Sequence, residues 1–134
     1  SDGIILLDLG REIPVSEIRT YSWHLSEIHP GMRRRAVQRY TLWGAGEQKP
    51  ESMPSNSAAA GWTRIARVDT DAFFRVRDEP DRPAQQACAI QSSQGAIGSY
   101  RYLLFEVFPT PMPDGLPARH TFFGEIDVFT LTNP

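Results

Sequence analysis

The segment YRYLLFEVF, residues 100–108, decides the fold class of this chain. It is rich in aromatic and branched side chains, it follows Gly98 and Ser99, and Pro109 ends it, as is typical of a β-strand. Its apolar part, YLLFEVF, is the longest apolar run in the sequence. A membrane-spanning helix needs roughly 20 apolar residues. The segment is therefore predicted to be a strand of a globular domain.

Runs of the same kind recur along the chain, whereas apolar spacing typical of helices is nearly absent. The other predicted strands are IILLDL (4–9), VSEIRTYSW (15–23), RYTLWGA (39–45), WTRIARVD (62–69), ACAIQSS (87–93) and FFGEIDVFTL (122–131). Seven strands in one domain indicate an all-β fold, an antiparallel sandwich or barrel. Hydrophobic alternation is imperfect in the segments 15–23 and 62–69, so we expect β-bulges there.

Length and composition indicate one globular domain over residues 1–134. The chain is 40% hydrophobic and 22% charged, which is ordinary for a folded protein. Its formal net charge of -2 lacks the basic excess of a nucleic-acid binder. Cys88 is the single cysteine and is predicted to be a buried small hydrophobe. The chain opens with SDG rather than Met, so we expect a processed or excised part of a longer polypeptide.

Antiparallel strands that follow one another reverse direction, so alternate connections emerge at opposite ends of the domain. This places three long, arginine-bearing connections at one end: residues 24–38, 70–86 and 109–121. The connections 10–14, 44–61 and 93–99 fall at the other end. The first of these ends is the one predicted to bind a ligand.

Five motifs in a fixed order carry a family resemblance. They are LDLGREIPVSEIRTY (7–21), QRYTLWGA (38–45), GWTRIARV (61–68), GSYRYLLFEVF (98–108) and FFGEIDVFTL (122–131). In this order they resemble discoidin domains, also called coagulation-factor C-type domains, and the galactose-binding carbohydrate modules of bacterial secreted enzymes. Trp62 matches the family's tryptophan, Arg101 and Tyr102 match its Arg-Tyr strand, and Glu125 opens the core of its closing strand.

The resemblance implies a jelly-roll β-sandwich of the galactose-binding-domain-like superfamily that binds rather than catalyses. Its members bind galactose-type sugars, other glycans, anionic phospholipid or protein partners through loops at one end. It also implies an extracellular, periplasmic or cell-surface location. Family members usually begin with a further segment that holds the first strand, a binding loop and part of a calcium site. Because this chain begins near DGIILLDLG, the resemblance is to an N-terminally short member, with Glu125 as the candidate ligand of a structural calcium.

The connection 24–38 holds the densest group of candidate ligand-binding residues. A sugar site needs an aromatic face for the apolar side of a pyranose and planar polar groups for its hydroxyls. The candidates here are Trp23, His24, His29, Arg33 and Arg35. The alternatives are that Trp23 belongs to the core, that His24 is a surface residue, and that the arginines form a solvated charge run.

The two neighbouring connections supply further candidates, namely Arg75, Arg77, Arg119 and His120. Phe73 and Phe74 are ambiguous between a core contact and an exposed membrane-binding spike. Membrane binding depends on their exposure and is the least favoured of the binding hypotheses.

Metal binding and catalysis are weighed against these binding hypotheses. HLSEIH (24–29) lacks the HExxH spacing of zinc proteases, and no helix would bring its groups onto one face. The pairs Asp69 with Asp71 and Glu125 with Asp127 could place carboxyl groups about 7 Å apart on one strand face. Each pair would project from a single strand of a small sandwich, where no deep cleft is expected, and the sequence contains no nucleophile elbow. We therefore expect a non-enzymatic module that binds glycan or, alternatively, other domains of its parent protein, with no nucleic-acid partner.

Overall fold

The computed structural model describes residues 3–24, 37–54, 61–70, 84–109 and 123–131. Within these ranges the chain forms six strands: β1 Gly3–His24, β2 Arg39–Ala45, β3 Thr63–Asp69, β4 Ala84–Gln91, β5 Gly98–Val107 and β6 Glu125–Thr130. Every pairing between them is antiparallel. The described residues contain no helix long and apolar enough to cross a membrane.

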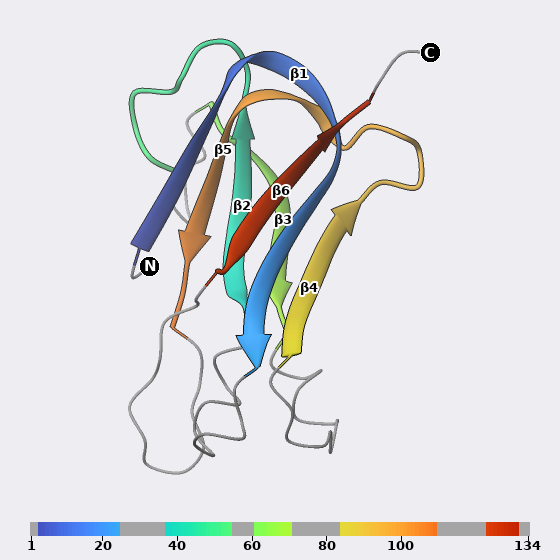
Figure 1. Ribbon diagram of the computed structural model, residues 1–134. Helices are drawn as coiled ribbons and strands as arrows, with labels where there is room; N and C mark the ends of the chain where they lie inside the picture. Colours follow the sequence, from blue (N-terminus) through green and yellow to red (C-terminus); the bar gives the residue numbers. More distant parts are fainter. Residues whose placement is uncertain (1–2, 25–36, 55–60, 71–83, 110–122, 132–134) are drawn as a thin grey trace.

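The strands form one sheet that curls into a half-barrel (Figure 1). Its order is β3-β2-β5-β1-β4, and β6 pairs with β1 beside this path. The all-β, antiparallel prediction is confirmed. The finer prediction of a jelly-roll sandwich stays a prediction.

Strand β1 connects the two parts of the sheet. Its N-terminal arm, Gly3–Asp8, pairs with β5, and its C-terminal part lies between β4 and β6. The prediction of two separate strands over 4–9 and 15–23 is therefore wrong, because the chain stays extended through the intervening residues. The pairing register shifts between Asp8 and Ile13, where Gly10 has a φ of 86° and donates its N–H to Asp8 Oδ1 at 2.8 Å.

The predicted bulges are confirmed. The register of β1 against β6 shifts between Val15 and Glu17. The register of β2 against β3 shifts between Leu42 and Trp43, opposite the predicted strand 62–69. Both shifts bend the sheet, because a bulge adds local twist to the strand that carries it.

The concave face of the half-barrel holds the larger core, which we call the concave core. Its buried members are Val15, Ile18, Tyr40, Leu42, Val68, Leu103, Phe105 and Val107. The rings of Tyr40 and Phe105 both lie against Phe123, with centroids 5.5 Å and 6.1 Å away. Side chains from β1, β2, β3 and β5 thus meet inside the curl, which explains why the sheet is not flat.

The convex face carries a smaller cluster, the convex core, made of Trp43, Ala45, Trp62 and Leu104. Trp62 precedes β3 and is 4% exposed, and its indole N–H donates to the carbonyl of Ser52 at 2.8 Å. The segment after β2 is thereby fixed beside the sheet.

Candidate functional site

The half-barrel has two distinct ends, and the strand directions bring the strand termini beside the three long connections to one of them (Figure 1). We call that one the loop end. It is defined by the strand termini His24, Arg39, Asp69, Ala84, Val107 and Glu125. The pairs His24 with Ala84 and Arg39 with Asp69 bring these termini together. These residues flank the three segments in which most candidate ligand-binding residues lie.

The structure places the backbone of two candidates at this end. Trp23 and His24 are the last residues of β1 and pair with Gln85 and Ala84 of β4. The other candidates from the three connections lie outside the described residues. They are His29, Arg33, Arg35, Arg75, Arg77, Arg119 and His120, together with Phe73 and Phe74.

Glu125, the candidate calcium ligand, is the first residue of β6 and is exposed. It pairs with Tyr21 of β1. Within the described ranges, no three His, Cys, Asp or Glu side chains are grouped so that they could hold a metal ion. The calcium site stays a prediction that rests on the resemblance.

A buried polar network lies inside the curl, close to the loop end. The Gln38 side-chain amide donates to the carbonyl oxygen of Thr20 at 3.0 Å and to Ser22 Oγ at 3.2 Å. Its amide oxygen accepts a hydrogen bond from the Thr20 hydroxyl. That hydroxyl has one proton, so the Tyr40 phenol, 3.0 Å away, donates to Thr20 Oγ1. The network joins β1 to the start of β2 and fixes the spacing of two strand termini at the loop end.

Burial controls the protonation of the two titratable groups beside this network. It raises the pKa of the Tyr40 phenol far above its usual value, so the phenol remains protonated at physiological pH. Burial also raises the pKa of the Cys88 thiol, which favours the neutral form over the reactive thiolate. Cys88 is half-buried and packs against the concave core. It therefore packs as a small hydrophobe, but it is half-buried rather than buried as predicted.

Arg39 and Phe108 form a half-buried rim at the loop end. The guanidinium of Arg39 lies 6.0 Å from the centroid of the Phe108 ring and donates to the carbonyl of Pro109 at 3.2 Å. Arg39 Nε is also 3.7 Å from Asp69 Oδ2, with the two side chains 38% and 50% exposed. The rim therefore brings a planar cation, an aromatic ring and a carboxylate together at the surface, and each of the three already has a partner within the chain.

The sequence analysis missed Arg39 and Phe108 as candidates. Both lie at the ends of predicted strands, and the sequence pattern therefore predicts strand residues there rather than parts of a binding surface. The available signal was their position. A strand terminus beside a long connection faces the same end of the domain as that connection.

The opposite end, the turn end, is held by a charged clamp. Arg101 donates to both carboxylate oxygens of Asp8, at 3.0 Å and 3.3 Å, and to Glu47 Oε1 at 2.6 Å. Glu47 in turn accepts the backbone N–H of Glu12 at 2.9 Å. The hydrogen bond from Arg101 is the main reason that the pKa of Asp8 is lowered. The hydrogen bond from the Glu12 N–H is the main reason that the pKa of Glu47 is lowered. These groups fix the bulged part of β1 to β5 and to the segment after β2, which is a structural role.

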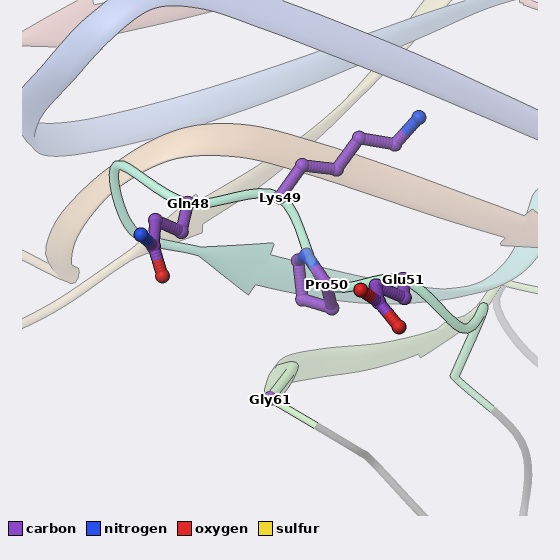
Figure 2. A pocket seen from close by; sticks show the side chains of 5 residues that line it. All are labelled: Gln48, Lys49, Pro50, Glu51 and Gly61. Carbon is purple, nitrogen blue, oxygen red and sulfur yellow. The ribbon is translucent and has the colours of Figure 1, made fainter.

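A shallow recess near the segment after β2 is lined by Gln48, Lys49, Pro50, Glu51 and Gly61 (Figure 2). Figure 2 shows that the Lys49 side chain points away from Pro50 and Gly61. The polar groups that line the recess therefore do not converge on one point, whereas those of a specific ligand site do. We regard the loop end as the stronger candidate.

Of the carboxylate pairs considered from the sequence, Asp71 lies outside the described residues, and Asp69 faces Arg39 as given above. Glu125 and Asp127 lie on β6 and are paired with Tyr21 and Arg19 of β1.

Comparisons of the chain with protein-family models, with curated proteins and with solved structures find no match.

Proposed function

We propose that this chain is a non-catalytic binding module that recognises carbohydrate at the loop end. The observation that carries the proposal is the convergence of strand termini there, with the half-buried Arg39–Phe108 rim beside them. An aromatic ring can pack on the apolar side of a pyranose, and a guanidinium can donate paired hydrogen bonds to hydroxyl or carboxylate oxygens. The indole, imidazole and guanidinium groups of the adjoining connections would add to the same surface.

A carbohydrate bound at a rim of half-buried side chains makes few contacts. We therefore expect weak single-site binding, from millimolar to tens of micromolar, or about 4 to 6 kcal/mol. Useful retention then depends on several sites or on a tethered partner domain. The proposed location outside the cytoplasm, the jelly-roll form of the fold and a calcium near Glu125 belong to the same proposal and rest on the family resemblance.

Titration calorimetry and a glycan array with galactose-type and acidic sugars test the proposal. We expect His24→Ala and Arg39→Ala each to weaken binding at least tenfold. Arg64→Ala is the control, because Arg64 is an exposed arginine that pairs with Trp43, toward the opposite end of the β2–β3 pair from the terminus where Arg39 pairs with Asp69. No heat and no array signal at millimolar sugar would contradict the proposal.

Chemical-shift mapping of the bound sugar locates the site independently of any substitution. Shifts at strand termini of the loop end support the proposal. Shifts confined to Gln48–Glu51 would move the site to the recess of Figure 2 and overturn the assignment.

A module for protein assembly is the second candidate function. It is favoured by a different observation, the open sheet edge described next.

A further inference from the structure

The N-terminal arm of β1 has a partner strand on one side and an open edge on the other. Gly3–Asp8 pairs with β5. Val15 pairs with Gly98 of β5 and also with Thr130 of β6, so β5 and β6 lie on opposite sides of β1. The pairing with β6 begins at Val15, and within the described ranges no strand continues it along Gly3–Asp8. Figure 1 shows this arm at the margin of the sheet.

The surroundings of the arm agree with an open edge. Ile4 is 46% exposed, although it is an isoleucine within a strand. A Cβ placed on Gly3 would meet nothing within 4 Å. Every second residue of such a strand turns its N–H and C=O away from its partner, so the edge offers unpaired backbone groups.

Residues 3–7 of the arm carry no charge, in contrast to a terminal strand protected by charged side chains. The terminal strand β3 carries the exposed charges of Arg64, Arg67 and Asp69. The terminal strand β4 is uncharged but consists mainly of Ala and Gln, with little apolar surface to bury. The arm instead reads Gly-Ile-Ile-Leu-Leu, and its first charge, Asp8, is held by Arg101. An uncharged apolar edge is the kind to which another strand adds.

We propose that the arm pairs with the same arm of a second copy of this chain, extending the sheet across a two-fold axis. A two-fold axis perpendicular to a sheet places residues with the same facing opposite one another. Centred on Leu6, the pairing sets Ile5 against the partner's Leu7 on the concave side. Ile5 and Leu7 already pack against the concave core, and Leu6 packs against the convex core. The apolar surfaces of both faces thus continue from one copy into the other.

Charge also fits a second copy. In this register Asp8 faces the partner's Ile4, so the two Asp8 carboxylates lie about 14 Å apart along the strands. That separation exceeds the Debye length of about 8 Å at physiological ionic strength. Each Asp8 is in addition balanced by its own Arg101. The antiparallel arrangement directs the loop ends of the two copies in opposite directions. The dimer would therefore bind two separate ligands, one at each loop end, rather than one ligand with both loop ends.

Sedimentation velocity across about 5 to 500 µM tests the pairing. A short edge interface should be weak, with a dissociation constant on the order of tens of micromolar. We expect wild-type protein to shift from monomer to dimer over this range, and Ile4→Lys to move the midpoint at least tenfold higher. Phe129→Lys is the control, because Phe129 is 39% exposed and lies on β6. A monomer throughout, or equal effects of both substitutions, would overturn the proposal.

Amide hydrogen exchange tests the same pairing on the wild-type protein, so the result does not depend on whether a substituted variant folds. At high concentration the outward amides of residues 3–8 should gain protection, while those of β3 should not. Protection that is independent of concentration would mean that this chain covers its own edge, which also overturns the proposal. Sugar binding is measured separately, so a failure of the dimer leaves the carbohydrate proposal standing, and the converse holds as well.

Discussion

The two faces of the sheet bury similar apolar side chains but differ in how fully their buried polar groups are hydrogen-bonded. On the concave face, the Gln38 amide and the Thr20 and Tyr40 hydroxyls bond to one another inside the curl. On the convex face, Glu106 is only 8% exposed, and among the described residues its side chain has one donor, the Trp43 indole N–H at 3.3 Å. The concave face is closed by strands, whereas the convex cluster is closed by Trp62 and the segment fixed to it.

This difference in hydrogen bonding indicates which face of the sheet determines the fold. A satisfied network between strands holds them in one arrangement, because any other arrangement leaves buried groups unpaired. A carboxylate with a single long hydrogen bond specifies much less, because its burial costs free energy that the bond only partly offsets. The concave face should therefore be the sensitive one.

Leu103 and Leu104 give the most direct comparison, since they are adjacent on β5, both are fully buried and they face opposite cores. We expect Leu103→Ala to lower the free energy of unfolding by about 4 kcal/mol and Leu104→Ala by about 2 to 3 kcal/mol. The smaller loss follows because the segment over the convex core can settle into the cavity. Urea denaturation of both variants checks this, and an equal or reversed order would refute the distinction.

Gln38→Ala tests the concave network. The substitution leaves the Thr20 carbonyl and the Ser22 hydroxyl without the donor that they now share. We expect a loss of about 2 to 3 kcal/mol, since buried groups would be left unpaired. Gln38→Glu keeps the volume but removes the donor, so it should be no more stable than Gln38→Ala. Recovery of wild-type stability in Gln38→Glu would show that the amide donor is unimportant.

Glu106→Gln tests the convex carboxylate. Glutamine keeps an acceptor for the Trp43 indole N–H and removes the cost of burying a charge. We expect stability between unchanged and about 1 kcal/mol higher, measured by the same denaturation. Trp43→Phe is the companion variant, because it removes the donor and leaves Glu106 in place. A marked loss in Glu106→Gln would mean that the carboxylate is needed on this face.

Arg101→Met should have the smallest effect, because the clamp lies in solvent at the turn end. The pKa values of Asp8 and Glu47 are lowered in the folded protein. Their contribution is therefore present above the unfolded values of about 4 and is lost as pH falls through the folded values. The stability difference between wild type and Arg101→Met should be largest near pH 7 and vanish toward pH 2. A difference that grows on acidification would contradict this assignment.

Local patterns predict the strands well but not their joining. The segments 39–45, 62–69 and 100–108 carry clear strand signals and coincide closely with β2, β3 and β5. Gly10 lies where the register of β1 against β5 shifts, and Pro14 follows that shift with Ser99 as its partner, all within one extended strand. Turn signals and bulge signals use the same residues, so a local pattern cannot separate them.

The curl of the sheet and the polar interior depend on contacts between distant residues. Gln38 precedes a strand and has the composition of a loop residue, yet it is 1% exposed because Thr20 and Ser22 meet it across the curl. Arg39 belongs to the candidate site because β3 brings Asp69 beside it. Alternation along one strand shows which residues share a face, but it does not show which other strand faces them.

The place of β1 at the centre of the sheet has a consequence for synthesis on the ribosome. Its partners are β4, β5 and β6, which begin 60 or more residues after β1 ends. At about 5 to 20 residues per second, the start of β5 emerges roughly 4 to 15 s after β1 is complete. The hairpin of β2 and β3 can form in that interval, but the Ile-Ile-Leu-Leu arm of β1 waits without a partner strand. The nascent chain therefore exposes this apolar segment for several seconds before its partner strand exists, which makes β1 the natural binding point for a chaperone.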